Sequence, residues 1–289
     1  MTGELDEPAP VTDPGSTPNA PGKRQKVRLD ALLVARGLAQ TRTQAQAVIM
    51  AGQVWVGEVV ADKPGKSVWD DAPLRMNREA PYVSRGGLKL EAALDAFGLK
   101  PQGWICADIG ASTGGFTDCL LQRGAARVYA IDVGYGQLAW PLRQNPRVIS
   151  LERTNIRHLS GLPEKVSLAT VDVSFIGLSL VLPKVVDLLE PAGQVVALIK
   201  PQFEVGKGQV GKGGVVRDAA QHRRVIEKVL TEASEVGLAP AGTIRSPVSG
   251  PAGNVEFLAW FIAGGTPPTP FERDSWVQAC LASPARVSP

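Results

Sequence analysis

The 289-residue sequence is poor in the residues that bind zinc and form disulfides. It has three cysteines, Cys106, Cys119 and Cys280, with no Cys-x-x-Cys pair, and its two histidines, His158 and His222, lie far apart. This set predicts neither a disulfide framework nor a His/Cys zinc site. We therefore expect no metal at the functional site.

The sequence also lacks a long hydrophobic run. No segment approaches the roughly 18 apolar residues that a membrane-spanning helix needs. The first ten residues, MTGELDEPAP, have neither the basic start nor the apolar core of a secretory signal peptide. These absences predict a cytoplasmic protein without a membrane span, and 44% hydrophobic content is enough for a substantial core.

Charge is unevenly distributed, although the net charge is only +3. Residues 1–22 carry four acidic residues and no basic one, and residues 23–89 carry twelve Lys or Arg against six Asp or Glu. Residues 90–289 are nearly balanced, with nineteen against eighteen. The basic segment is either a solvated surface or, as we expect, a site for a polyanion.

The N-terminal quarter of the chain predicts a tail followed by a small α+β domain. Residues 1–26 contain five prolines and almost no large apolar residue, which is typical of disorder. Residues 27–70 predict a helix ending near Gly37, a second from about Thr41 to Ala51, the strands QVWVG and EVVA, and a DKPG turn. Residues 71–82 are expected to be a linker.

Five basic residues of this segment are expected to form one phosphate-contacting face. They are Arg28, Arg36, Arg42, Lys63 and Lys66. The run RLDALLVARGLAQTRTQAQAVIMAGQVWVG resembles the RNA-binding domain first seen in ribosomal protein S-four, in which a helix pair and a hairpin grip structured RNA. The resemblance implies that these five residues bind RNA.

Residues 83–263 alternate strands with helices, which predicts a mostly parallel sheet covered on both faces. The expected strands are WICADI, RVYAID, ATVDVSF and QVVALIK, and the expected helices begin at Gly115, run over LSLVLPKVVDLL, and extend from about Asp218 to Val236. Two further strands, near AGTIRSPV and NVEFLAWFI, are expected to form an antiparallel edge hairpin. Residues 264–289 are expected to be a C-terminal tail.

The stretch DIGASTGG follows the first strand, where an open α/β sheet binds its ligand. Its glycines do not have the G-x-G-x-x-G spacing of dinucleotide sites. Asp108 suits an ammonium group, and Asp132, after the second strand, suits two ribose hydroxyls. These features predict a binding site for S-adenosylmethionine. The alternative is that the glycine turn only connects the strand tightly to the next helix. The expected cofactor-binding residues are Asp108, Gly110, Ser112, Gly114, Gly115, Phe116 and Asp132.

A second glycine-rich run, GKGQVGKG from Gly206 to Gly213, nearly matches the phosphate loop G-x-x-x-x-G-K-S/T. Gly213 occupies the position where Ser or Thr would hold magnesium, so the run does not predict a nucleotide triphosphatase. Its lysines, Lys207 and Lys212, either close over substrate RNA or lie on a solvated lid.

Four charged residues lie at or beside apolar runs, where charges are usually avoided. They are Lys89, Asp172, Lys200 and Glu256. Each alone has an ordinary explanation, such as a helix surface, a cap, a strand end or an exposed edge. Asp172 and Lys200, however, are expected at the same sheet edge as the glycine loop.

In this order, with DIGASTGGFTD between the first two, these residues resemble the Lys-Asp-Lys-Glu tetrad of FtsJ-like ribose 2'-O-methyltransferases. The chain from Val27 to Ile262 resembles the TlyA family, hemolysin-named proteins that methylate cytidine ribose in ribosomal RNA. The runs YVSRGGLKL, DIGASTGGFTD, ERTNIR, VDVSFI and LIKPQFE carry the match.

The resemblance implies a Rossmann-like, S-adenosylmethionine-dependent methyltransferase sheet behind a small α+β RNA-binding domain. Its partner would be ribosomal RNA or a ribosomal subunit, with large-subunit RNA as the substrate and small-subunit RNA as a further candidate. Lys200 would be either a neutral base or a charged group that steadies the developing oxyanion. Asp172 would position Lys200 and the methyl group, while Lys89 and Glu256 hold the nucleotide.

Two other functions stay open from the sequence: a non-catalytic RNA-binding ribosome assembly factor, and a hemolysin acting on membranes. The sequence predicts no particular oligomeric state.

Overall fold

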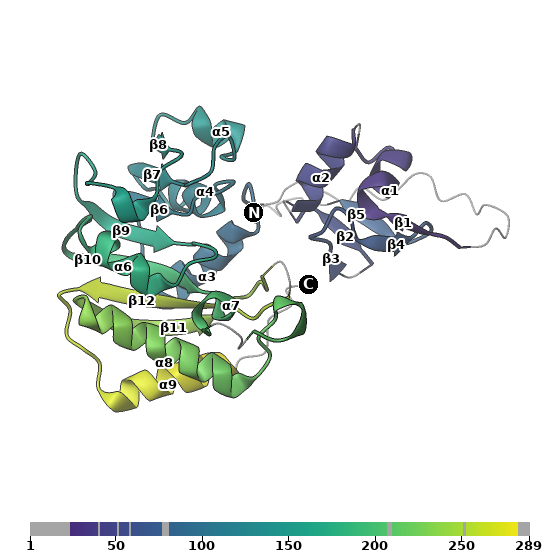
Figure 1. Cartoon of the computed structure of the whole chain (residues 1–289). Coiled ribbons are helices and arrows are strands. Elements are labelled where there is room, and N and C mark those ends of the chain that lie inside the picture. The colour runs from purple at the N-terminus through teal and green to yellow at the C-terminus, as the bar shows by residue number, and fades with distance from the viewer. Residues whose placement is uncertain are drawn as a thin grey trace, which may run out of the picture. The chain divides into compact units, whose positions relative to one another are not determined.

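The computed structural model describes residues 24–39, 41–50, 52–57, 59–76, 81–206, 210–250 and 253–282. The chain forms two compact units that divide between Ser84 and Arg85. Figure 1 shows the helices and strands of each unit, which are described separately below.

The N-terminal unit combines a helix pair with two small antiparallel sheets, ordered β1-β4 and β3-β2-β5. Its elements are β1 (Lys26–Arg28), α1 (Leu29–Ala35), α2 (Arg42–Met50), β2 (Val54–Val56), β3 (Val59–Val60), β4 (Ser67–Trp69) and β5 (Leu74–Met76). Leu29, Leu33, Ile49 and Val54 are fully buried in a core that both helices share with the strands.

The predicted helix pair and hairpin are present in this unit. Gly37, just after α1, has a φ of +69°, a conformation that favours glycine and ends the helix there. The predicted linker over residues 71–82 is wrong for Leu74–Met76, which pairs with β2. The predicted tail over residues 1–26 is wrong for Lys26, which begins β1, and residues 1–23 lie outside the described residues.

The C-terminal unit is built on a seven-stranded sheet with the order β11-β12-β10-β9-β6-β7-β8. Its strands are β6 (Ile105–Ile109), β7 (Arg127–Ile131), β8 (Val148–Leu151), β9 (Val166–Val171), β10 (Leu189–Ile199), β11 (Leu238–Arg245) and β12 (Phe257–Ala263). All neighbours from β10 to β8 pair in parallel, whereas β12 is antiparallel to both β10 and β11. The chain runs from β6 outward to β8 and returns on the other side of β6. The topological switch point, where such sheets bind ligands, therefore lies between β6 and β9.

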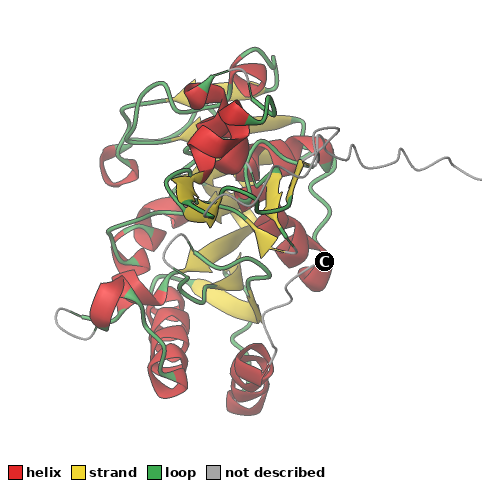
Figure 2. Ribbon diagram, turned by 90° about the vertical axis from the view of Figure 1, so that its right-hand side faces the viewer, coloured by secondary structure: helices red, strands yellow, loops and turns green. Residues whose placement is uncertain are grey.

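Helices cover both faces of this sheet (Figure 2). They are α3 (Gly86–Phe97), α4 (Gly115–Gln122), α5 (Trp140–Arg143), α6 (Leu182–Val186), α7 (Pro201–Glu204), α8 (Ala219–Glu235) and α9 (Pro270–Ala282), with 3-10 turns η1 (Ile156–His158), η2 (Leu178–Leu180) and η3 (Lys212–Gly214). Ala107 and Ile109 of β6 share a hydrophobic cluster with α6, α8 and α9. Alternation along the strand therefore turns Asp108 toward the opposite face. No described helix is long and apolar enough to cross a bilayer.

The predicted mostly parallel sheet and its antiparallel edge hairpin are confirmed. The single helix expected over LSLVLPKVVDLL is instead η2 followed by α6. Pro183, near the start of α6, lacks the backbone N–H that a continuous helix would need there. β8 was not predicted, because its four residues give too short a pattern.

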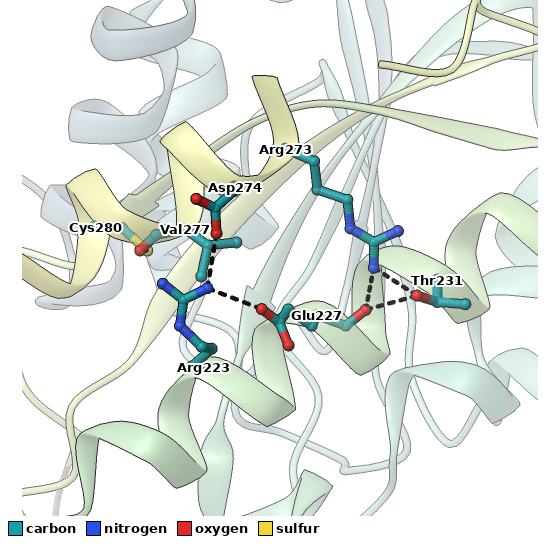
Figure 3. Close-up of polar contacts among 7 residues, drawn as sticks. All are labelled: Arg223, Glu227, Thr231, Arg273, Asp274, Val277 and Cys280. Atoms are coloured by element: carbon teal, nitrogen blue, oxygen red, sulfur yellow. Dashed lines mark hydrogen bonds and ion pairs between the residues drawn. The ribbon is translucent and has the colours of Figure 1, made fainter. Parts of the chain in front are cut away.

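The predicted C-terminal tail over residues 264–289 is wrong for α9. This helix packs on α8 and β11 and buries Val277 and Cys280. Figure 3 shows the polar contacts along its junction with α8: the Arg223 guanidinium lies 2.8 Å from Asp274 Oδ1 and 3.0 Å from Glu227 Oε1. The helix therefore belongs to the C-terminal unit.

Candidate active site

Three members of the predicted tetrad lie at one edge of the seven-stranded sheet. Asp172 follows β9, Lys200 follows β10 and Glu256 immediately precedes β12. Because β12 is antiparallel to β10, with Ile199 opposite Phe257, the start of β12 lies beside the end of β10. Lys200 and Glu256 are thus neighbours along this edge.

The tetrad forms two ion pairs. Lys200 Nζ lies 2.6 Å from Asp172 Oδ1, and Lys89 Nζ, in the first turn of α3, donates to Glu256 Oε2 at 2.6 Å. The side chains of Lys89 and Glu256 are only 10% and 1% exposed, so the explanations of a helix surface and an exposed strand edge do not apply to them. Charges this deeply buried are kept where they are paired.

Lys200 has a further partner that the sequence analysis missed. Its Nζ donates to Ser174 Oγ at 2.8 Å. The next residue, Phe175, is 90% exposed, has a φ of +64°, and lies with its ring centroid 5.0 Å from that of Phe203. A bulky residue in this conformation costs about 1–3 kcal/mol, and such strain is concentrated at functional sites.

The loop after β6 needs glycine at two positions. Gly110 has a φ of +85°, and a Cβ there would lie 2.3 Å from the Asp172 carbonyl oxygen. Gly114 has a φ of +95°, and a Cβ would lie 2.3 Å from Leu142 Cδ1 and 2.7 Å from Leu138 Cδ1. Glycine thus lets this loop approach the end of β9, beside the Lys200–Asp172 pair.

Asp132 follows β7 and holds the same loop. Its Oδ2 accepts the Ser112 N–H at 2.8 Å, and its Oδ1 accepts the Gly134 N–H at 2.6 Å. The side chain is half-buried, and each carboxylate oxygen keeps a lone pair for a further donor. Asp132 therefore lies at the edge of the sheet where the cofactor is predicted.

Gly115 and Phe116 begin α4 and are buried, with Phe116 in the core.

Asp108 lies where the sequence analysis did not expect it. The strand runs on to Ile109, so Asp108 points toward α4 and is fully buried. The hydroxyls of Thr117 and Thr170 donate to its two oxygens at 2.7 and 3.1 Å. Burial raises the pKa of this carboxyl to about 7, against the opposite effect of the two hydroxyls. The predicted contact with a cofactor ammonium group has no support in this geometry.

In the N-terminal unit, Asp30 gathers two of the predicted RNA-binding residues. Arg28 donates two hydrogen bonds to its carboxylate, at 3.0 and 2.9 Å, and Arg42 and Gln46 donate one each, at 3.1 and 3.0 Å. The hydrogen bonds from Arg28 hold the pKa of this buried carboxyl far below its usual range. The side chains of Arg28 and Arg42 are still 52% and 57% exposed, so two guanidinium groups are fixed near one another at the surface.

The turn that carries Lys63 and Lys66 lies beside Arg28. A Cβ on Gly65 would lie 3.0 Å from Arg28 Nη1, and both lysines are exposed. We call Arg28, Arg42, Lys63 and Lys66 the basic face.

Arg36, the fifth predicted RNA-binding residue, is not part of the basic face. Its guanidinium donates to the carbonyl oxygens of Ala72 and Asp70, at 2.8 and 2.6 Å, and so holds the turn between β4 and β5. These hydrogen bonds indicate that Arg36 stabilises the fold of the N-terminal unit.

The second glycine-rich run is only partly described. Lys207 lies outside the described residues, and the side chain of Lys212 is not described. Asn254, which the sequence analysis missed, accepts the Val216 N–H at 3.0 Å and donates to the Gly214 carbonyl at 2.9 Å. Because Asn254 lies two residues before Glu256, the residues directly after this run are tied to the segment that carries the tetrad's glutamate.

Comparisons with known proteins match both units of the chain to known families. The FtsJ-like methyltransferase family matches residues 82–262, and the S4 domain matches residues 27–68. The 16S/23S rRNA (cytidine-2'-O)-methyltransferase TlyA of Mycobacterium tuberculosis is 49% identical over 82% of this chain and 90% of its own. Hemolysin A of Brachyspira hyodysenteriae is 39% identical over 82% of this chain and 100% of its own.

A solved structure of a hemolysin-named protein from Streptococcus thermophilus is also similar. It has a TM-score of 0.69 and 45% identity, and it covers 88% of this chain and 94% of that one. The matches extend over most of the chain and include both units. The chain belongs to the TlyA family of FtsJ-like methyltransferases that carry an S4 domain.

Proposed function

We propose that this chain transfers a methyl group from S-adenosylmethionine to the ribose 2'-hydroxyl of a cytidine in ribosomal RNA. The observation that carries the proposal is the Lys200–Asp172 ion pair beside the glycine loop at the switch point, with Lys89–Glu256 next to it. The cytidine and ribosomal RNA are the substrates named for the TlyA relative that is 49% identical.

The residues at this edge fit the proposed cofactor, which supplies an electrophilic methyl group when bound. Gly110 and Gly114 adopt positive φ angles that favour glycine, and Gly110 lets the loop lie against the Asp172 backbone, which brings the proposed cofactor loop beside the Lys200–Asp172 pair. Asp132 would accept ribose hydroxyls with its remaining lone pairs. Asp108 would act indirectly, because its bond with Thr117 fixes the first turn of α4 below the loop.

A ribose hydroxyl is a weak nucleophile and must lose its proton before or during attack. Lys200 Nζ is the group that we assign to meet this hydroxyl. Nζ pairs with Asp172 and donates a hydrogen bond to Ser174, and these two contacts would keep it in place for the reacting oxygen. A charged Lys200 would steady the developing oxyanion, whereas a neutral one would take the proton.

The other groups would place the RNA. Lys89 and Glu256, fixed against one another at the neighbouring strand, would hold the target nucleotide beside Lys200. The basic face of the N-terminal unit would bind phosphates of the RNA, because its cations are exposed and two of them are fixed by Asp30.

Transfer of labelled methyl groups to ribosomal RNA, free and within each subunit, tests the proposal. We expect Lys200→Ala to lower the rate at least about a hundredfold, the range of a lost acid–base group. Lys184→Ala is the matched control, since Lys184 is exposed on α6 and pairs with Asp187. Lys200→Arg separates the two roles: it keeps measurable activity if charge suffices and none if Lys200 is the base.

Transfer by Lys200→Ala at the wild-type rate would contradict the assignment. A wild-type chain that binds ribosomal RNA tightly but transfers no methyl group would instead favour the non-catalytic assembly factor.

A further inference from the structure

Glu204, the last residue of α7, is a buried acid four residues after Lys200. It is only 5% exposed, and this burial raises the pKa of its carboxyl group, opposed by a backbone hydrogen bond from Leu178. Burying a carboxyl group costs free energy unless specific partners offset the loss of water. The contacts of Glu204 therefore indicate what the residue is for.

The main partner of Glu204 lies on a different segment of the site. Its Oε1 accepts the backbone N–H of Leu178 at 2.8 Å. Leu178 directly follows residues 172–177, here called the Asp172 loop, which also carry Ser174. The Lys200–Asp172 ion pair joins this loop to the Lys200 segment at its beginning, and Glu204 joins the same two segments at its end.

The Asp172 loop needs an anchor because part of it is strained. Phe175 has a φ of +64°, an unfavourable conformation for a bulky residue. The Asp172 N–H is fixed by the Ile109 carbonyl at 2.8 Å, so the loop is held at its first residue. At the other end, a Cβ on Gly177 would lie 3.4 Å from Glu204 Oε2, which shows how closely the loop passes over this carboxylate.

The surroundings of Glu204 also suit a test by substitution. Lys228 Nζ lies 3.6 Å from Oε2 and donates to the Glu204 carbonyl at 3.2 Å. Among the described residues, Oε2 has no hydrogen-bond donor. A pocket of about 430 Å³ adjoins Glu204, Arg224 and Lys228.

We propose that Glu204 is a positioning residue for methyl transfer, which anchors the Asp172 loop so that Asp172 and Ser174 keep Lys200 in place. The inference rests on the proposed methyl transfer at Lys200. Glu204 itself contacts neither the substrate nor the reacting atoms in this account.

Comparing Glu204→Gln with Glu204→Met separates the effect of losing the hydrogen bond from Leu178 from the effects of losing the charge and changing the side-chain size. Both side chains are neutral and of similar length, but only the glutamine amide oxygen can accept the Leu178 N–H. We expect Glu204→Met to lower kcat at least about tenfold with KM for RNA and cofactor within about twofold, because small displacements of reacting groups mainly affect the chemical step. Glu204→Gln should keep most of kcat.

Glu232→Gln is the matched control. Glu232 Oε1 also lies near Lys228 Nζ, at 3.7 Å, and its Oε2 is buried without a hydrogen-bond donor among the described residues. Because the described contact of Glu232 is with Lys228 of the same helix, α8, this variant should keep the wild-type kcat.

Thermal unfolding of each variant establishes that the proteins compared are folded. Wild-type kcat in Glu204→Met, or an equal loss in Glu204→Gln and Glu204→Met, would overturn the positioning role. If Glu204→Met does not fold, a tenfold loss in folded Glu204→Gln overturns it, and retained kcat there supports it. A wild-type chain without any transfer contradicts the proposed function itself rather than the role of Glu204.

Discussion

At the residue scale, the protein buries several acids with hydrogen-bonding partners, and two of these acids are held from a distant part of the chain. Glu256 is held by Lys89 across 167 positions, and Asp108 by Thr170 across 62. Buried carboxyl groups lose their interaction with water. The hydrogen-bonding partners therefore determine the pKa of each carboxyl group and how much its burial destabilises the fold.

Asp108 is expected to make stability depend on pH. Burial raises its pKa from the ordinary 3.8 to about 7, so between these values the folded state binds a proton that the unfolded state does not. Its contribution to stability is present below about pH 4 and is lost as the pH rises through about 7. Asp108→Asn cannot ionise and should therefore gain stability relative to wild type as the pH increases.

Urea unfolding of Asp108→Asn and wild type at pH 4 and pH 8 measures this effect. The difference in unfolding free energy, variant minus wild type, should rise by on the order of 4 kcal/mol between the two pH values. A difference that is independent of pH would show that Asp108 ionises normally in the folded protein.

Some site residues could be predicted from the sequence because their chemistry conflicts with their surroundings. Asp172 and Lys200 stand out as charges at the ends of apolar runs. Ser174 and Asn254 do not, because each acts through a hydrogen bond to a residue 26 or 38 positions away. The burial of Asp108 could not be predicted from the strand pattern alone, because it depends on α4 packing over the face opposite Ala107 and Ile109, where Thr117 meets the carboxyl group.

At the element scale, strands were predicted where the apolar pattern was long or where a tight turn joined two short strands, as in β2 and β3. The long buried strands β6, β9 and β10 were predicted, as their runs are nearly continuous. β5 and β8, of three and four residues, gave no clear pattern and were missed. The helix α9 was missed because its sequence, PFERDSWVQACLA, is largely polar and buries only a narrow stripe.

The docking of α9 is expected to stabilise the C-terminal unit mainly through its apolar side. Val277 is fully buried, whereas Phe271 of the same helix is 82% exposed. Val277→Ala should lower the free energy of unfolding by about 1–3 kcal/mol, because it leaves a cavity in the core. Phe271→Ala should change it by less than about 0.5 kcal/mol.

Urea unfolding of both variants tests this account of α9. Equal effects of the two substitutions would mean that the helix does not pack as described. The ion pair between Arg223 and Asp274 in Figure 3 should contribute little by comparison, since the Asp274 side chain is 59% exposed and the pair is open to solvent.

At the scale of the whole molecule, RNA binding and methyl transfer are assigned to different units. The cations of the basic face would bind RNA in the ground state and the transition state alike. Uniform binding of this kind lowers KM without changing kcat. Substitutions in the two units should therefore have different kinetic signatures.

Arg42→Ala is expected to raise KM for ribosomal RNA with kcat unchanged. Loss of one phosphate contact should also reduce the slope of log affinity against log salt by about 1. Arg36→Ala is the control within the same unit: it removes the bonds to Ala72 and Asp70 and should lower stability without this change in salt slope. RNA titrations at several salt concentrations separate the two, and identical slopes for Arg42→Ala and wild type would remove Arg42 from the RNA interface.

The position of the methyl group on the RNA tests the central claim most directly. A 2'-O-methyl group prevents that oxygen from attacking the adjacent phosphodiester, so alkaline hydrolysis of RNA labelled by the wild-type enzyme should release the label in alkali-resistant dinucleotides that begin with cytidine. Lys200→Ala should give no such product. Label in ordinary mononucleotides would indicate methylation of a base and would contradict the assignment of Lys200 and its partners to a ribose hydroxyl.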